Sequence, residues 1–423
     1  MSLDLIDPTL LKEQCYVDGA WVGRGESEVT NPATGAVIAR VPRFGAEEAT
    51  AAVDAAAAAF KPWGARTAKE RAKLIRQWYE RIMAHRDDLA LILTSEQGKP
   101  LAEARGEIDY AASYIEFYAE EAKRIAGETL PSHRADARIL VLRQPTGVVG
   151  AITPWNFPAA MITRKAAPAL AAGCTIVVKP AGETPLTALA LAELADRAGI
   201  PKGVFNVVTG DSKAIGGVLT SHSAIRLVNF TGSTEVGKLL MRQAAGTVKK
   251  VALELGGNAP FIVFDDADLD AAVEGAMVSK FRNMGQTCVC ANRIYAQAGI
   301  HDAFVEKLTA AVAKLKVGNG VEAGVTQGPL INDKAIAKVE EHLADAKAKG
   351  ASIVLGGQRH ALGGAYFEPT VLTGATAAMQ LAREETFGPL APVFRFETEE
   401  EVIRAANDTE FGLAAYFYSR DIG

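Results

Sequence analysis

Residues 281–290, FRNMGQTCVC, place two cysteines one residue apart in a chain that has only four. Such a pair is open to three chemistries: a metal site, a disulfide or a nucleophilic thiol. The histidines show no ligand spacing, so we expect no metal, and four cysteines make a poor disulfide framework for 423 residues. Cys288, after a Gly-Gln-Thr turn, is our candidate nucleophile, with a buried inert thiol as the alternative. Cys290 precedes a predicted strand and is expected to pack as a small apolar residue.

Two further polar residues lie where the sequence suggests a fixed backbone. Asn156 stands between two prolines in PWNFP, and an immobile amide is a good hydrogen-bond donor to an oxyanion. An asparagine that bonds its own turn is the alternative. Glu254 ends the strand-like run VALE before a glycine pair, where burial among Leu and Val would suit a general base. Exposure on the solvent face of that strand is equally compatible with the alternation.

Two strand-to-helix junctions suit a phosphorylated cofactor. In VNFTGSTEVG, Gly232 and Ser233 turn the chain from a strand into a helix, whose first N–H groups and dipole attract a pyrophosphate. In TIVVKPAGETP, Lys179 ends a strand, where open α/β sheets bind ligands. Neither segment is a G-x-G-x-x-G or Walker motif. A plain turn and a solvated lysine are therefore the alternatives.

The elements that position these residues alternate along the chain. Alanine-rich helical patterns are interleaved with short β-branched runs, which predicts an α/β protein with a mainly parallel sheet. Residues 67–98 predict one long helix. Residues 137–154 predict two extended segments around QPTG, suggesting an arm or hairpin. At LGGNAPFIV the preceding strand–helix alternation gives way to a buried strand followed by an acid-capped helix, which predicts a domain boundary near Gly256.

The composition excludes several classes of partner. A net charge of -5 favours neither a nucleic acid nor an anionic membrane surface. The N-terminus carries acids where a signal peptide would carry bases. The longest apolar stretch, residues 166–178, is too short to span a bilayer and contains a proline and a glycine. We therefore expect a cytoplasmic protein with no nucleic-acid or membrane partner.

Six motifs in order, PWNFP, KPA, FTGSTEVG, LELGGNAPFIV, GQTCVCANR and EETFGPLAPV, resemble the aldehyde dehydrogenase superfamily over nearly the whole chain. ITPWNFPAAMITRKAAPALAAGC, SKFRNMGQTCVCANR and EFGLAAYFYSRD are most similar to succinate-semialdehyde dehydrogenases. The resemblance implies an α/β aldehyde dehydrogenase fold. It implies a Rossmann-like NAD(P)-binding domain over residues 1–125 and 147–254, an oligomerisation arm over 126–146 and an α/β catalytic domain over 255–423. The family continues past YSRDIG, so the resemblance implies a missing C-terminal end and, at full length, a homodimer or homotetramer.

The resemblance also implies roles for the residues that match its motifs. Cys288 would attack an aldehyde, and Asn156 with the Cys288 N–H would hold the thiohemiacetal oxygen. After hydride transfer to the nicotinamide, Glu254 would activate the water that hydrolyses the thioester. The positions that match cofactor contacts are Trp155, Asn156, Lys179, Pro180, Ala181, Gly182, Gly232, Ser233, Leu255, Glu385 and Phe387.

Three further matches concern specificity and regulation. Arg164 and Arg282 match arginines that grip the distal carboxylate of the substrate, with ordinary ion pairs as the alternative. Cys290 matches a cysteine that in some relatives forms a redox-sensitive disulfide with the nucleophile, although a bridge between residues i and i+2 is strained. Gly182 stands where many NAD-preferring relatives have an acidic residue. The resemblance thus implies that NADP is used at least as well as NAD.

The predicted reaction is the NAD(P)-dependent oxidation of a small-molecule semialdehyde, with succinate semialdehyde as the expected substrate. Glutarate semialdehyde is a near rival because one methylene contributes only about 1–3 kcal/mol of discrimination. A general aldehyde dehydrogenase would need the same nucleophile and cofactor. A non-redox thioesterase or acyl transferase, and an inactive binding or structural protein, are also compatible with these residues.

Overall fold

The computed structural model describes residues 3–421, which form two compact units. Unit 1 comprises residues 3–30, 37–96 and 104–254, and unit 2 comprises residues 31–36, 97–103 and 255–421. The chain therefore passes from unit 1 to unit 2 between Glu254 and Leu255. The sequence expectation placed residues 31–36 and 97–103 in the first domain, but they pack with unit 2. One reason is a backbone hydrogen bond of 2.9 Å from the Leu101 N–H to the Gly320 carbonyl.

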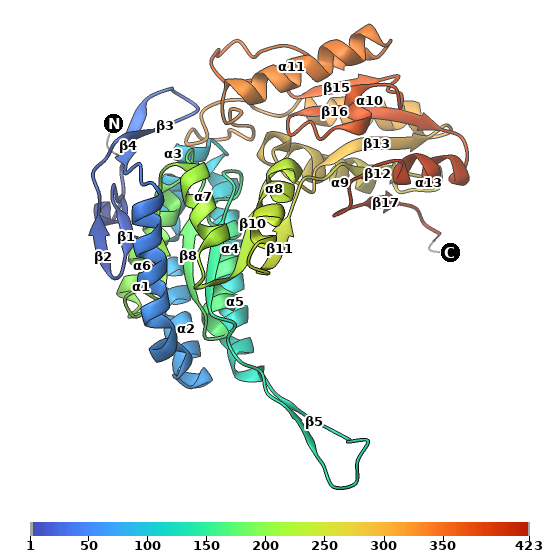
Figure 1. Cartoon of the computed structure of the whole chain (residues 1–423). Helices are drawn as coiled ribbons and strands as arrows, with labels where there is room; N and C mark the ends of the chain where they lie inside the picture. Colours follow the sequence, from blue (N-terminus) through green and yellow to red (C-terminus); the bar gives the residue numbers. More distant parts are fainter. Residues whose placement is uncertain (1–2, 422–423) are drawn as a thin grey trace. The chain divides into compact units, whose positions relative to one another are not determined.

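Unit 1 is built on a seven-stranded sheet of order β11-β10-β7-β8-β9-β1-β2, in which β7 to β11 run parallel (Figure 1). Its strands are β1 (Cys15–Val17), β2 (Ala20–Val22), β7 (Val148–Ile152), β8 (Thr175–Lys179), β9 (Phe205–Val207), β10 (Ile225–Thr231) and β11 (Lys250–Glu254). Two antiparallel ribbons pair β3 (Ser27–Thr30) with β4 (Val37–Val41) and β5 (Glu128–Leu130) with β6 (Ile139–Val141). The helices are α1 (Ala46–Gly64), α2 (Ala68–Ala84), α3 (Arg86–Gln97), α4 (Leu101–Glu121), α5 (Ala160–Ala171), α6 (Leu186–Arg197), α7 (Ser212–Ser221) and α8 (Thr234–Ala245), with short 3₁₀ turns at Pro8–Leu10 and Ala122–Arg124.

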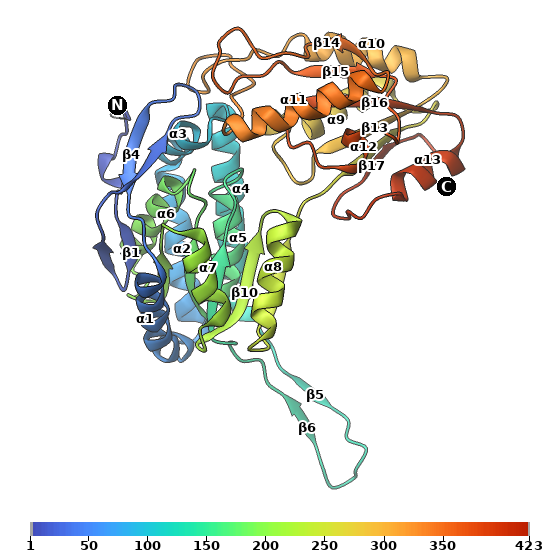
Figure 2. The ribbon, with the colours of Figure 1, turned by 45° about the horizontal axis from the view of Figure 1, so that its top comes forward.

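Helices cover both faces of the parallel strands (Figures 1 and 2). On one face, Val53 of α1 and Ile215 of α7 share a buried cluster with Val177 of β8. On the other face lie α5 and α6. Nearly all residues of these two helices are buried, since the sheet lies on one side of them and α2 packs against the other. Trp78 of α2 donates from Nε1 to the Leu191 carbonyl of α6 at 3.1 Å. Among residues 3–421, no helix is both long enough and apolar enough to cross a membrane.

Two details of unit 1 differ from the sequence prediction. The helix predicted over residues 67–98 is broken at His85 into α2 and α3. The break lets the Asp88 carboxylate accept hydrogen bonds from the N–H groups of Ile6 and Asp7, each at 2.8 Å. The two extended segments of residues 137–154 do not pair with each other. Instead β6 pairs with β5 and β7 joins the central sheet.

The hairpin of β5 and β6 extends away from the rest of unit 1 (Figures 1 and 2). It lies within residues 126–146, the range that the resemblance assigns to an arm. Leu140 and Leu142 at this hairpin are 70% and 77% exposed. Such exposed leucines are typical of a surface that contacts another protein.

Unit 2 is a second α/β layer structure around a six-stranded sheet of order β14-β15-β16-β13-β12-β17. The strands are β12 (Ala259–Val263), β13 (Ala291–Gln297), β14 (Ser352–Leu355), β15 (Thr370–Thr373), β16 (Leu390–Phe396) and β17 (Tyr416–Tyr418); β14 alone is antiparallel to its neighbour. The helices are α9 (Leu269–Phe281), α10 (His301–Val312), α11 (Asp333–Ala348), α12 (Gln380–Arg383) and α13 (Glu399–Asn407), with a 3₁₀ turn at Arg282–Gly285.

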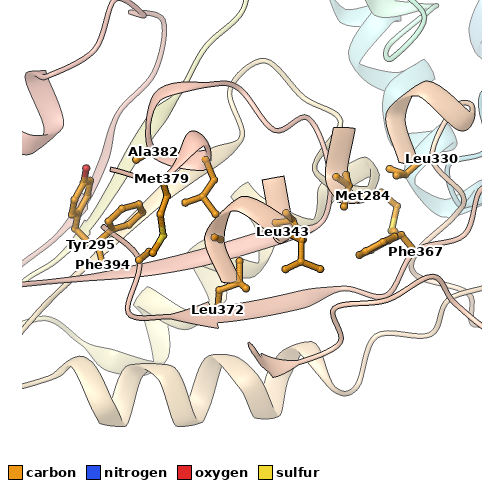
Figure 3. Close-up of a cluster of buried hydrophobic side chains, with 14 of the residues drawn as sticks. Met284, Tyr295, Leu330, Leu343, Phe367, Leu372, Met379, Ala382 and Phe394 are labelled. Carbon is orange, nitrogen blue, oxygen red and sulfur yellow. The ribbon is translucent and has the colours of Figure 1, made fainter. Parts of the chain in front are cut away.

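Two hydrophobic clusters hold the helices of unit 2 against its sheet. On one face, Phe281 of α9 and Phe304 of α10 pack with Ile294 of β13. On the other, Leu343 of α11 packs in a cluster that includes Phe394 of β16 (Figure 3). The fold is therefore the α/β class that the alternating pattern predicts.

Two buried carboxylates hold the N-termini of α5 and α6. Glu107 of α4 accepts hydrogen bonds from the N–H groups of Ala159 and Ala160, at 3.0 and 3.3 Å. Glu96 of α3 accepts from the N–H groups of Leu186 and Thr187, at 2.7 and 2.8 Å. A carboxylate satisfies the free N–H groups of a helix start and interacts favourably with the helix dipole. Burial raises the pKa of Glu96 to about 8, although these bonds oppose the rise.

Replacing Glu107 with alanine leaves two buried N–H groups without this acceptor. We expect the free energy of unfolding to fall by about 2–6 kcal/mol, at about 1–3 kcal/mol for each of the two unsatisfied groups. A urea titration followed by circular dichroism measures the loss. Glu107→Gln keeps an acceptor oxygen and should lose less than half as much. Equal losses in the two variants would show that the charge, and not the acceptor, holds α5.

Candidate active site

The candidate residues of unit 1 gather at one edge of its sheet. Because β7, β8, β10 and β11 are parallel, their carboxyl ends meet there, with Ile152 paired to both Lys179 and Phe230 and with Thr231 paired to Glu254. The chain adds β8 and β9 on one side of β7 and then returns to add β10 on the other side. Open α/β sheets bind ligands at such a reversal of strand order.

Asn156 is placed by the turn that follows β7. Asn156 is 5% exposed, and α5 begins four residues later. The turn is tied to the neighbouring strand because the Thr153 N–H donates to the Lys179 carbonyl at 3.1 Å. Trp155, just before Asn156, is half-buried. A buried amide in a braced turn has the fixed position that an oxyanion donor needs.

Next to this edge lies a buried lysine that the sequence analysis missed. The Lys165 Nζ of α5 donates to Thr231 Oγ1 at 2.6 Å. Burial, together with the neighbouring Arg164, lowers the pKa of Lys165 to about 8, and Glu254 acts in the opposite direction. The adjacent cations in TRKAAPAL, within an otherwise apolar helix, were the signal that could have revealed it.

Glu254 lies between the buried and exposed alternatives that the sequence left open. It ends β11, which is the edge strand of the sheet, and none of the five residues of β11 is fully buried. Glu254 itself is half-buried, and its backbone carbonyl accepts from the Gly232 N–H at 3.0 Å. The sequence left burial and solvent exposure equally open, and the structure gives an intermediate state because an edge strand has a neighbour on one side only. A half-buried carboxylate remains open to water, which a general base must reach.

Arg164 lies on α5, one turn after the Asn156 segment. Its guanidinium carbon stands 5.6 Å from the centre of the Tyr114 ring, and its Nη1 is 3.8 Å from the sulfur of Met161. Within residues 3–421, Arg164 forms no ion pair with a carboxylate. The alternative of an ordinary ion pair therefore finds no support at Arg164. The guanidinium keeps its charge and donors for another partner.

The residues of unit 1 that would hold a dinucleotide fit that group. The Ser233 Oγ accepts from the Val236 N–H at 3.4 Å and so caps α8. Lys179 is 4% exposed, and its ammonium donates only to the Pro180 carbonyl at 2.9 Å among the described residues. A cavity of about 230 Å³ is lined by Pro180 and Gly182, among others, with the half-buried Ala181 between them. A capped helix start and a buried cation without a carboxylate partner suit an anionic ligand.

In unit 2, Cys288 is half-buried in a tightly braced turn after α9. Asn283, Met284 and Gly285 have φ values of 50°, 57° and 75°, which is the left-handed region. Non-glycine residues there store backbone strain, which concentrates at functional sites. The buried Gln286 braces the turn, because its Oε1 accepts from the Ile331 N–H at 3.0 Å. Met284 anchors the turn in the cluster of Figure 3, near Leu330 and Phe367.

Close backbone packing fixes Cys288 against Gly257, two residues after Leu255. A Cβ atom on Gly257 would lie 2.3 Å from the Cys288 carbonyl oxygen. Glu385 joins the same group, because its Oε1 accepts from the Gly257 N–H at 3.2 Å. The structure of unit 2 thus brings Cys288 and Glu385 to one glycine pair. Phe387 is half-buried two residues after Glu385, with a left-handed φ of 54°.

The surroundings of Cys290 contain two residues that the sequence analysis missed. Cys290 is fully buried, as expected for a packing residue, and burial raises the pKa of its thiol. The buried Lys280 ammonium donates to the Cys290 sulfur at 3.3 Å and to Asn292 Oδ1 at 3.2 Å. The Tyr416 hydroxyl of β17 donates to the Val289 carbonyl at 2.8 Å, between the two cysteines. No sequence signal pointed to this tyrosine, which is 126 positions beyond Cys290.

The predicted site residues thus form two groups. Unit 1 holds Trp155, Asn156, Arg164, Lys179, Pro180, Ala181, Gly182, Gly232, Ser233 and Glu254; unit 2 holds Leu255, Arg282, Cys288, Cys290, Glu385 and Phe387. Arg282, directly after α9, is exposed. Chemically, unit 2 offers a nucleophilic thiol, and unit 1 offers an amide donor, cations and a carboxylate. Within residues 3–421, no set of three or more His, Cys, Asp or Glu side chains is arranged to hold a metal ion.

Alanine at Gly257 should disturb the Cys288 turn. The new methyl group meets a backbone carbonyl, so we expect a loss of about 1–3 kcal/mol in the free energy of unfolding, measured by urea titration. Cys288 should also react faster with iodoacetamide, because the displaced turn opens around the thiol. Gly412→Ala is the matched control, since no atom lies within 4 Å of its Cβ position. An unchanged free energy of unfolding and an unchanged alkylation rate in Gly257→Ala would show that the Cys288 turn can move to accommodate the methyl group without loss of stability.

Glu385 should make stability depend on pH. Burial raises the pKa of Glu385 to about 7, and the Gly257 N–H and nearby lysines oppose this rise. The folded protein therefore keeps a proton that the unfolded chain releases near pH 4.5. This contribution to stability is complete below pH 4.5 and is lost as the pH rises through 7.

Glu385→Gln removes that titration. Relative to the parent protein, the variant should gain about 2 kcal/mol between pH 5 and pH 8, at about 1.4 kcal/mol for each pKa unit. Urea titrations at four pH values measure the difference, with Glu306→Gln on the exposed side of α10 as the control. A constant difference across this range would contradict the raised pKa.

Comparison with known proteins identifies the family. Residues 21–423 match the family described as "Aldehyde dehydrogenase family". A 3-sulfolactaldehyde dehydrogenase of Pseudomonas putida is 64% identical, over 100% of this chain and 87% of its own length. A glutarate-semialdehyde dehydrogenase of Pseudomonas aeruginosa is 63% identical, over 99% and 88%. An NADP(+) succinate-semialdehyde dehydrogenase of Escherichia coli is 62% identical, also over 99% and 88%. The chain belongs to the aldehyde dehydrogenase family.

Proposed function

We propose that the protein oxidises succinate semialdehyde to succinate with NAD(P), through a thiohemiacetal and a thioester on Cys288. The observation that carries the substrate assignment is the guanidinium of Arg164. It lies half-buried beside the Asn156 segment and has no carboxylate partner among the described residues. A planar fork of donors recognises a carboxylate better than an ammonium group does.

The reaction begins at Cys288. Its thiolate attacks the carbonyl carbon of the aldehyde, and the carbonyl oxygen becomes an alkoxide. Asn156 Nδ2 and the Cys288 N–H donate to this oxygen and stabilise its charge. A thiol is suited to this step because sulfur is a strong nucleophile.

When bound, NAD(P) supplies an acceptor for the hydride of the thiohemiacetal carbon. Unit 1 would hold the dinucleotide through Lys179, Pro180, Ala181, Gly182, Gly232, Ser233 and Trp155, and unit 2 through Leu255, Glu385 and Phe387. The loss of hydride leaves a thioester between the substrate and Cys288. Glu254 then takes a proton from water as the water attacks the thioester, and the carboxylate product leaves with the thiolate restored. The half-buried position of Glu254 supports this role.

The distal end of the substrate is assigned to Arg164 and Arg282. The aldehydes in the names of the three relatives each carry an anionic group away from the aldehyde, which supports a cationic clamp. Glutarate semialdehyde is the second candidate substrate, because one methylene contributes only about 1–3 kcal/mol. A non-redox thioesterase would turn over without any nicotinamide, which separates that reaction directly.

We also propose that the protein is a cytoplasmic homodimer or homotetramer that uses the hairpin of β5 and β6 as its arm. The exposed Leu140 and Leu142 of this hairpin support the proposal, because burying them in an interface is favourable. Cys288 and Cys290, which form no disulfide in the structure, are further proposed to form one when a peroxide accepts two electrons and two protons from the two thiols and is reduced to water. The bond from Lys280 to the Cys290 sulfur would have to break for that to happen.

The test of the substrate clamp compares succinate semialdehyde with butanal, which has the same chain length without the carboxylate. Arg164→Ala should lower kcat/KM for succinate semialdehyde about a hundredfold and change it less than threefold for butanal, since a lost charge-assisted fork costs about 3 kcal/mol. Initial rates of nicotinamide reduction provide both values. Arg105→Ala, an exposed residue paired with Asp87, is the matched control.

Measuring the same rates with other aldehydes decides between the candidate substrates. Glutarate semialdehyde and 3-sulfolactaldehyde are measured beside succinate semialdehyde, and the largest kcat/KM names the substrate. Equal losses for butanal and succinate semialdehyde in Arg164→Ala would refute the clamp and leave a general aldehyde dehydrogenase.

A further inference from the structure

Unit 1 has a cavity beside Pro180, the residue that follows β8. Its volume is about 230 Å³, and its walls include Arg43, Pro180, Gly182, Gly210 and Asp211. These residues come from the segments that follow β4, β8 and β9, so the cavity lies at the carboxyl ends of β8 and β9. In the sheet, β9 stands on the side of β8 away from β10. A cavity of this size holds one end of a dinucleotide while the rest extends along the sheet edge.

The charges around this cavity favour an anion. The Lys179 ammonium is almost fully buried and bonds only the adjacent Pro180 carbonyl within the described chain. Burial of a cation without a carboxylate partner is costly unless a ligand supplies the missing interaction. At Gly182, no atom lies within 4 Å of the place where a Cβ would stand. The position is therefore open and carries no side chain that would repel a phosphate.

Arg43 is the second cation at this cavity. Its Nη2 lies 4.0 Å from Asp211 Oδ2, the outer limit of an ion pair, and its side chain is 66% exposed. The Asp211 carboxylate has another task, because its Oδ1 accepts from the N–H groups of Lys213 and Ala214 at 2.9 and 2.8 Å and so caps α7. The Arg43 guanidinium is thus held loosely at the cavity, with most of its five donors available.

The adenosine end of the cofactor is already assigned to this strand edge by the positions that match cofactor contacts. We propose that Arg43, in the wall of this cavity, binds the 2′-phosphate that distinguishes NADP from NAD. The inference rests on the proposed function, since it requires a nicotinamide dinucleotide. Arg43 is a specificity residue in this assignment, because a guanidinium fork matches a phosphate and gains nothing from the free 2′-hydroxyl of NAD. Lys179 serves the ribose of both cofactors.

The first test measures binding without the reaction. Isothermal titration calorimetry of the purified protein compares 2′,5′-ADP, which carries the 2′-phosphate, with 5′-AMP, which does not. Arg43→Ala should weaken binding of 2′,5′-ADP about tenfold or more and leave 5′-AMP within twofold. Arg40→Ala is the matched control, because Arg40 lies on the same segment, pairs with Glu28 and does not line the cavity.

A second variant should act in the opposite direction. Asp211→Asn keeps the helix cap, since asparagine caps as well as aspartate, but removes a negative charge beside Arg43. Binding of 2′,5′-ADP should then tighten severalfold. In steady-state rates, Arg43→Ala should raise KM for NADP about tenfold with kcat unchanged, while KM for NAD stays constant.

Two outcomes would overturn the inference. Equal weakening of both nucleotides by Arg43→Ala would show that Arg43 supports only the local structure, and no weakening would show that the phosphate binds elsewhere. Failure of the proposed function gives a different result. An enzyme without semialdehyde activity can still bind 2′,5′-ADP through Arg43, whereas an active enzyme with unchanged nucleotide binding in Arg43→Ala refutes this inference alone.

Discussion

The parallel pairing of β7, β8, β10 and β11 is the constraint on which the chemistry of unit 1 depends. Parallel strands must run in the same direction, so the segments that follow them emerge at one edge. Residues more than twenty positions apart in the chain are thereby aligned, as the pairing of Thr231 with Glu254 and of Ile152 with Lys179 shows. The buried carboxylates of Glu96 and Glu107 extend this order to the helices, because they hold the starts of α6 and α5.

In unit 2, the candidate nucleophile is positioned by close backbone packing and not by the alignment of strand ends. The Cys288 carbonyl fits against Gly257, whose missing side chain leaves room for it, and the strained turn before it is anchored by Met284 and Gln286. The thiol is therefore held by groups that cannot easily move. This rigidity suits a nucleophile, because a misplacement of about 1 Å reduces a rate about a hundredfold.

Three buried lysines that bond neutral groups lie near the predicted site residues. Lys165, Lys179 and Lys280 each lose most of their contact with water yet face a hydroxyl, a carbonyl or a thiol. Burial lowers the pKa values of Lys165 and Lys179, and each of these two ammonium groups keeps donors available for a ligand. The exposed ion pairs of the surface, such as that of Arg105 and Asp87, contribute little by comparison.

The sequence alone determined the α/β class and the family, because these depend on local periodicity and on motifs of residues close in the chain. It was wrong where a distant partner decides, since the helix break at His85 serves the contact of Asp88 with the N-terminal segment. It left the burial of Glu254 open, because only the sheet order shows that Glu254 lies on an edge strand. Lys165, Lys280 and Tyr416 were missed because their part in the site depends on burial and on contacts that the sequence does not show. Tertiary structure decided those positions, since only folding brings Thr231, Cys290 and Val289 within reach of these three side chains.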